Sequence, residues 1–168
     1  MQAQRGRSSS RQELRTQGFS LVELLVVVAV ILIIAAIAIP NFIQSKERAN
    51  ESGAAQNLRT ITTAEVIYNT TYAVGFTNLT NLGGTGPTNS ATNAELIDPI
   101  LSSGTKSGYI FSYTTLASDG LGNVTSYSVN ADPTVPGYTG TRHFYTDQSG
   151  VIRENDTVAA GAADNPIQ

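Results

Sequence analysis

The sequence contains no cysteine among its 168 residues. Disulfide bonds and thiolate chemistry are therefore excluded. Basic residues are also scarce after residue 18, where six lysines and arginines face twelve aspartates and glutamates, a balance of −6. A surface that follows nucleic-acid phosphates needs a basic stripe, so this acidic balance argues against a nucleic-acid partner.

Residues that commonly carry enzyme chemistry are few. His143 is the single histidine, and it stands beside Phe144 in a segment predicted to be a strand, which favours a sheet residue over a catalytic base. The chain lacks the Gly-x-Ser-x-Gly elbow of serine hydrolases. Its loop aspartates lack the spacing of a calcium-binding loop; they are Asp119, Asp132, Asp147 and Asp156. We therefore predict no catalytic residue, no metal site and no cofactor, with an enzyme on a membrane anchor as a remote alternative.

One long apolar run, Phe19–Ile39, is interrupted only by Ser20 and Glu23. A helix needs about 20 apolar residues to cross a hydrocarbon core of about 30 Å, so this run is long enough to span a membrane. Four arginines precede the run and a single acid opposes them there. This pattern directs the N-terminus toward the cytoplasm. A lone carboxylate in a membrane span is costly and indicates a partner or a function.

Beyond Pro40 the helix is predicted to continue to about Tyr72. Apolar positions recur there at alternating spacings of four and three, with one acid among them; they are Ala54, Leu58, Ile61, Glu65, Tyr68 and Tyr72. A wetter face is expected to hold Lys46, Glu47, Arg48, Asn50, Glu51, Gln56 and Arg59. Pro40 lacks a backbone N–H and is expected to bend or loosen the helix.

The rest of the chain is predicted to be a loop over 73–107, a sheet over 108–154 and a tail over 155–168. A short helix within the loop would begin with Asn93 as its N-cap. After Gly108 the period changes to two, which predicts three or four antiparallel strands and a hairpin loop at 118–123; the strands are expected near 109–113, 125–129, 142–146 and 151–153. From Val158 onward the tail is expected to fray. A sheet covered by one helix is an α+β fold.

The segment 17–24, Gln-Gly-Phe-Ser-Leu-Val-Glu-Leu, followed by the apolar run and Pro40, resembles the N-terminus of type IV prepilins. The resemblance is specific over residues 15–45. It implies the pilin fold, in which one long helix, transmembrane in its first half and amphipathic in its second, packs on an antiparallel sheet. The parts would be a basic leader (1–18), a transmembrane and assembly helix (19–40), and a periplasmic or extracellular head (41–168).

The resemblance also implies roles for four residues. A prepilin peptidase would cut between Gly18 and Phe19 and N-methylate Phe19; because Gly18 has no Cβ, its carbonyl is unhindered. Glu23 would meet the new N-terminal amine of a neighbouring subunit and set the register of assembly. The alternative for Glu23 is a capping box with Ser20. In pilin filaments the region that matches Pro40 partly unwinds, which lets subunits pack and stretch, so the same role is expected here; the simpler alternative is a kink where the helix leaves the membrane. Many type IV pilins close a C-terminal loop with a disulfide, and this chain departs from that pattern.

Two simpler interpretations compete for the apolar run. A secretory signal peptide would be cut near Ala36 and Ala38, but the run exceeds the usual apolar region of about 7–15 residues and contains Glu23. An uncleaved anchor would leave Gly18 and Phe19 without a role. The prepilin pattern accounts for more of the segment than either alternative.

By resemblance, the chain is expected to be a structural subunit of a type IV pilus and not an enzyme. Its expected partners are identical subunits, the prepilin peptidase, and the assembly platform and motor. It would be a single-pass inner-membrane protein before assembly and part of an extracellular pilus afterwards. A type II secretion pseudopilin and a minor tip pilin are the alternatives. Major pseudopilins often carry a C-terminal calcium site, and no clear counterpart is visible near Asp147–Asp156.

Overall fold

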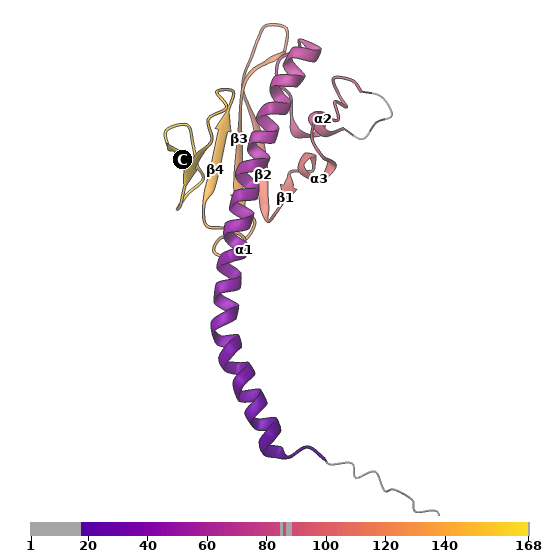
Figure 1. Cartoon of the computed structure of the whole chain (residues 1–168). Coiled ribbons are helices and arrows are strands. Elements are labelled where there is room, and N and C mark those ends of the chain that lie inside the picture. Colours follow the sequence, from indigo (N-terminus) through magenta and orange to yellow (C-terminus); the bar gives the residue numbers. More distant parts are fainter. Residues whose placement is uncertain (1–17, 85, 87–88, 168) are drawn as a thin grey trace, which may run out of the picture. The chain divides into compact units, whose positions relative to one another are not determined.

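The computed structural model describes residues 18–84, 86 and 89–167 (Figure 1). The predicted leader, apart from Gly18, lies outside the described residues. The chain divides into two compact units, Met1–Ile39 and Pro40–Gln168, and each unit is considered separately below. The described part of the first unit is the apolar beginning of helix α1 (Leu21–Tyr72), which extends into the second unit.

Helix α1 ends at Tyr72, as its periodicity predicts. The next residue, Ala73, has a φ of 55°, in the left-handed region that stops a helix. Within the second unit, one stripe of α1 is buried: Glu51, Ala54, Ala55, Asn57, Leu58, Ile61, Ala64, Glu65 and Tyr68. Glu51 was predicted on the wetter face, and that prediction is wrong. The residue stands three positions before Ala54 and so continues the stripe by one turn.

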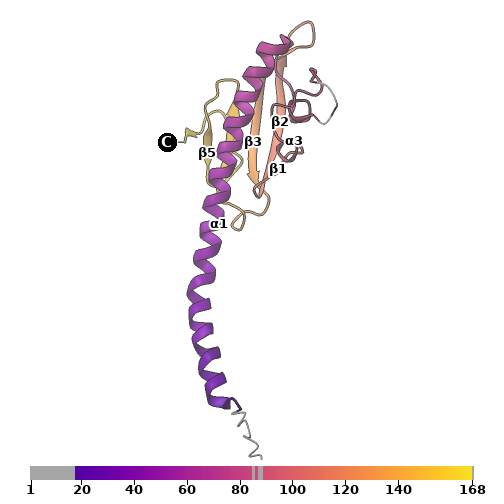
Figure 2. The ribbon, with the colours of Figure 1, turned by 45° about the vertical axis from the view of Figure 1, so that its right-hand side comes forward.

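The second unit contains one antiparallel sheet of six strands whose spatial order follows the chain order. The strands are β1 (Thr105–Lys106), β2 (Tyr109–Ser118), β3 (Val124–Pro133), β4 (His143–Asp147), β5 (Arg153–Asn155) and β6 (Asn165–Pro166). Figures 1 and 2 both show α1 crossing one face of this sheet. The α+β class is thereby confirmed. The predicted number of strands was too low, because β1 and β6 have only two residues each and show no periodic pattern.

The core lies between α1 and the sheet. Its largest fully buried apolar side chains are Tyr109, Tyr127, Phe144, Leu58, Ile61, Leu82, Leu101 and Val129. The ring of Tyr127 stacks on that of Tyr113 with centroids 5.4 Å apart. The hairpin loop between β2 and β3 lies where the sequence predicts it. Asp119 stabilises this loop by accepting hydrogen bonds from the N–H groups of Leu121 and Asn123, both at 2.8 Å.

The segment predicted as loop contains two short helices, α2 (Leu79–Gly83) and α3 (Pro99–Ser102). Asn93 does not cap a helix, so this prediction is wrong. Its side chain instead binds both the N–H and the carbonyl of Gly86. Helix α3 starts later, where the Asp98 carboxylate accepts hydrogen bonds from the helix N-terminus and Pro99 supplies a φ suited to a first turn.

The tail was expected to fray, and the structure corrects this expectation. Strand β6 pairs with β5, and the N–H of Ile167 donates to the carbonyl of Ile152 at 3.0 Å. Ala160 is 4% exposed, and its carbonyl accepts a 2.7 Å hydrogen bond from the side chain of Asn130. Backbone pairing and one partly buried side-chain amide therefore attach the C-terminal segment to the sheet in a chain that has no disulfide.

Candidate processing and assembly site

Gly18 and Phe19 precede α1 and are not helical. The Phe19 side chain is 91% exposed. A Cβ built on Gly18 would meet no atom within 4 Å. The peptide bond between these two residues is therefore sterically open to an enzyme that binds an extended backbone.

Helix α1 begins with the hydrogen bonds of a capping box. The N–H of Ser20 donates to Oε2 of Glu23 at 2.8 Å, and the N–H of Val22 donates to Oγ of Ser20 at 3.3 Å. The capping interpretation of Glu23 is thus confirmed for the single chain. It does not conflict with the second role predicted for Glu23, because a carboxylate has lone pairs for several donors.

The first unit exposes almost all of its apolar side chains. Every Leu, Val and Ile side chain between Leu21 and Ile39 is exposed, and Val28 has the lowest exposed fraction at 47%. Among the described residues, α1 is the one helix long and apolar enough to cross a membrane, with a mean hydropathy of 3.3 over its best window. Apolar surface this continuous requires lipid or another apolar surface to cover it.

Pro40 is the first residue of the second unit and lies inside α1. It has no N–H to donate to the carbonyl of Ala36, which weakens the helix locally. The bend expected at this residue stays a prediction.

A buried carboxylate in α1 binds the connection between β3 and β4. Glu51 is 7% exposed, and its Oε1 accepts hydrogen bonds from the N–H groups of Thr141 (2.9 Å) and Arg142 (3.2 Å). Its Oε2 pairs with Nε of Arg142 at 2.9 Å. Burial alone would raise the pKa of Glu51, but the two N–H groups and the guanidinium outweigh it, so the pKa lies below its ordinary value.

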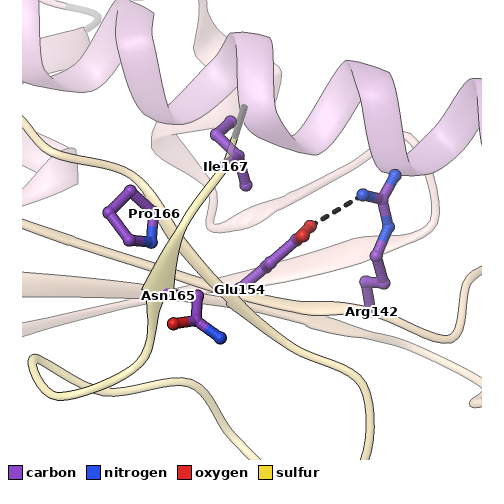
Figure 3. Close-up of a pocket in the computed structure, with 5 residues that line it drawn as sticks. All are labelled: Arg142, Glu154, Asn165, Pro166 and Ile167. Atoms are coloured by element: carbon purple, nitrogen blue, oxygen red, sulfur yellow. Dashed lines mark hydrogen bonds and ion pairs between the residues drawn. The ribbon is translucent and has the colours of Figure 1, made fainter.

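The same arginine connects this carboxylate to the C-terminal part of the sheet. Nη1 of Arg142 pairs with Oε2 of Glu154 at 2.7 Å (Figure 3). Both residues border a hollow of about 650 Å³ whose other lining residues are Asn165, Pro166 and Ile167. The guanidinium is already shared by two carboxylates. The arrangement therefore suits structural attachment better than the binding of an anion.

Three other polar residues considered from the sequence have structural contacts: Asp132, His143 and Asp147. Nδ1 of His143 lies 2.5 Å from Oδ1 of Asp132, which joins β4 to β3. Asp147 accepts a hydrogen bond from the N–H of Ser149 in the turn before β5. Within residues 18–84, 86 and 89–167, no group of three or more histidine, aspartate or glutamate side chains could hold a metal ion.

Comparison with known proteins agrees with the geometry of the N-terminal segment. Residues 14–39 match the family model described as the prokaryotic N-terminal methylation motif. The N-terminal segment of the chain thus carries a prokaryotic methylation motif where the resemblance to type IV prepilins places it. Over 56 residues it is 52% identical to the type IV major pilin protein PilA of Myxococcus xanthus (strain DK1622). These matches confirm the resemblance inferred from residues 17–24.

The matched part is limited in extent. The 56 residues are 33% of this chain and 26% of the Myxococcus protein, so the chain spans about a quarter of the length of the curated relative that it matches. No solved structure matches the chain. Sequence reasoning missed the contacts of Glu51, Arg142 and Glu154, although the spacing from Glu51 to Ala54 was a usable signal.

Proposed function

We propose that this chain is a structural subunit of a type IV pilus. In this proposal the prepilin peptidase cuts between Gly18 and Phe19, Phe19 is N-methylated, and the subunits polymerise through the apolar half of α1. The observation that carries the proposal is the methylation motif at residues 14–39 joined to a helix whose apolar side chains are exposed. Similarity to a major pilin supports a pilus over a secretion pseudopilin or a minor pilin.

In the proposed mechanism, α1 first anchors the subunit in the inner membrane, with its N-terminus in the cytoplasm. During assembly, the apolar helices exchange their contacts with lipid for contacts with the helices of neighbouring subunits. Lipid tails are as apolar as leucine, so the favourable free energy must come from close packing and polar pairing. An assembly platform and a motor would therefore extract each subunit, and Pro40 would let the helix adjust where it leaves the membrane.

Glu23 is proposed to direct this docking. Cleavage creates an amine at Phe19 with an ordinary pKa of about 7.7–8.0, which is largely cationic near neutral pH. The carboxylate of Glu23 would form an ion pair with this amine of a neighbouring subunit. A carboxylate buried among apolar helices without a cation would be strongly unfavourable, so the pair would favour one axial register.

The processing step predicts a defined N-terminus. Mass spectrometry of fibres sheared from the source cells should show a chain that lacks residues 1–18 and begins with N-methylated Phe19. Replacement of Gly18 by valine should leave the leader attached and abolish the fibres, because a side chain would then occupy the cleavage position. Fibres built from chains that retain residues 1–18 would contradict the proposal. A terminus at Ile39 would instead indicate a cleaved signal peptide.

Glu23→Gln is expected to be cleaved normally but to assemble poorly. Glutamine retains an oxygen that can accept from the N–H of Ser20, so the helix cap survives while the charge is lost. We expect at least about a tenfold decrease in fibres per cell, since about 1.4 kcal/mol per contact corresponds to this factor. Immunoblots of sheared and membrane fractions measure it, with Glu47→Gln as the control. Wild-type amounts of fibres from Glu23→Gln would refute the docking role.

A further inference from the structure

A groove lies between α1 and the chain that precedes α3. It has a volume of about 220 Å³ and is lined by Gln56, Arg59, Thr60, Thr63, Ala64, Ile67 and Leu96. Ile67 is 44% exposed, so the groove offers apolar surface. Arg59 is exposed, and none of the ion pairs found in the described part of the chain involves it. The groove therefore combines a cation with an apolar patch.

The outward face of α1 around this groove carries positive charge. Its exposed positions are Arg48, Ser52, Gln56, Arg59, Thr63, Val66, Ile67 and Thr70, which include two arginines and no acid. Arg48 and Arg59 are eleven residues apart, about three helical turns, so they share one face at a separation of about 16 Å. The chain after residue 18 has a net charge of −6, so a positively charged face differs from the rest of it.

A turn after β5 has the complementary properties. Oδ1 of Asn155 accepts hydrogen bonds from the N–H groups of Thr157 (3.0 Å) and Val158 (3.2 Å), which hold the turn in one conformation. The turn exposes Asp156, and Val158 is 60% exposed. It therefore presents a carboxylate and an apolar side chain two residues apart on a preorganised backbone.

The turn and the groove belong to the same unit but lie on different flanks of it. Figures 1 and 2 both show the C-terminal segment on one side of α1 and the segment with α2 and α3 on the other. A subunit is thus unable to place its own turn in its own groove. Two different surfaces that fit each other make a head-to-tail contact, and repetition of such a contact builds an open helical array when its rotation does not close into a ring.

We propose that the Asp156–Val158 turn of one copy docks in the Arg59 groove of the next copy. Asp156 pairs with the guanidinium of Arg59, while Val158 packs against Ile67 and Leu96. This inference rests on the proposed function, since it names a contact between heads in that filament. The ion pair lies at the rim of an interface and is screened by salt, so the contact weakens as ionic strength rises.

Charge reversal tests the proposed pair. Arg59→Glu and Asp156→Arg should each decrease fibres per cell by about tenfold, the factor that about 1.4 kcal/mol per contact produces. The double variant Arg59→Asp with Asp156→Arg should restore fibres to within about threefold of wild type, because the pair is re-formed with its charges exchanged. Thr114→Arg, at an exposed position on β2, controls for added charge alone. All three residues are replaced at exposed sites, so folding should be unaffected.

The absence of cysteine permits a direct test of contact. A chain with Thr63→Cys and Thr157→Cys should form a ladder of disulfide-linked multimers when its fibres are oxidised, whereas Thr114→Cys with Thr157→Cys should not. Fibres that begin at methylated Phe19 but give no ladder, together with wild-type assembly of both single charge variants, would overturn this inference alone. If wild-type cells make no such fibres, the proposed function fails instead.

Discussion

Replacing Glu65 by glutamine is expected to remove most of the pH dependence of the free energy of unfolding between pH 4.5 and about 8. Glu65 is fully buried in α1. Its Oε2 accepts one hydrogen bond, from the N–H of Thr77 at 3.0 Å. Neither Oε1 of Glu65 nor the buried hydroxyl of Tyr113 has a hydrogen-bond partner among the described residues. Burial raises the pKa of Glu65 from 4.5 to about 8, and the hydrogen bond from Thr77 opposes this only in part.

The free energy of unfolding decreases as the pH rises, because the native carboxyl of Glu65 binds its proton more tightly than the carboxyl of the unfolded chain does. Its contribution to stability is therefore complete below pH 4.5 and is lost as pH rises from 4.5 through about 8. The gap between these two pKa values corresponds to a loss of up to about 5 kcal/mol. Glutamine has no proton to lose, so Glu65→Gln should be the more stable form at pH 8.

Urea unfolding of the full-length chain in detergent, followed by near-ultraviolet circular dichroism of the tyrosines, measures this effect. The wild-type midpoint should fall steadily from pH 5 to pH 8, and the midpoint of Glu65→Gln should stay nearly constant. Glu95→Gln is the matched control, because Glu95 is exposed. Equal slopes for the wild type and Glu65→Gln would show that Glu65 is ionised in the native state.

Glu51→Ala should decrease the free energy of unfolding by about 3 kcal/mol, the low end of the loss when one partner of a buried ion pair is removed, because three hydrogen bonds to an ionised carboxylate are lost. The substitution leaves the N–H groups of Thr141 and Arg142 without their acceptor. It also removes one attachment of the β3–β4 connection to α1, while the side chain of Asn50 still donates to the carbonyl of Thr139. Arg142 keeps its pair with Glu154 and is partly exposed to water, which keeps the loss below that of a fully buried charge.

The pH dependence of this site is opposite to that of Glu65. Because the native pKa of Glu51 is lowered, its contribution is present above about pH 4.5 and is lost as the pH falls further. Thermal unfolding of wild type and Glu51→Ala should therefore converge in acid. Glu47→Ala, one turn earlier in α1, is the control and should change stability by less than about 0.5 kcal/mol. A difference that persists unchanged at pH 3 would contradict the assignment.

Elements with strong local patterns could be predicted from the sequence. The spacing of Leu58, Ile61 and Tyr68 is a property of one continuous segment, so the length of α1 follows from it. The alternation in β2 and β3 and the Asp-Gly turn between them are equally local. The methylation motif is also contained in adjacent residues. Each of these features depends on contacts within a few positions along the chain.

Features that depend on distant partners could not be predicted. Ala160 is buried, and its carbonyl accepts a hydrogen bond from the side chain of Asn130. No sequence pattern in the tail predicts that partner. Asn93 and Asp98 are both good N-caps, and the left-handed φ of 53° at Glu95 rules out a helix that starts at Asn93. Glu65 stands in an apolar stripe, and only its burial in the folded unit determines that its carboxyl keeps its proton up to about pH 8.

The chain-order arrangement of the sheet has a consequence for folding kinetics. Each strand pairs with its neighbour in sequence, so the sheet forms through short loop closures with low contact order, and such pairings form quickly. A newly made chain should consequently spend little time with unpaired strand edges, which are the usual starting points of amyloid-like aggregation. In the pilus subunit proposed above, rapid closure of this meander would limit aggregation before assembly.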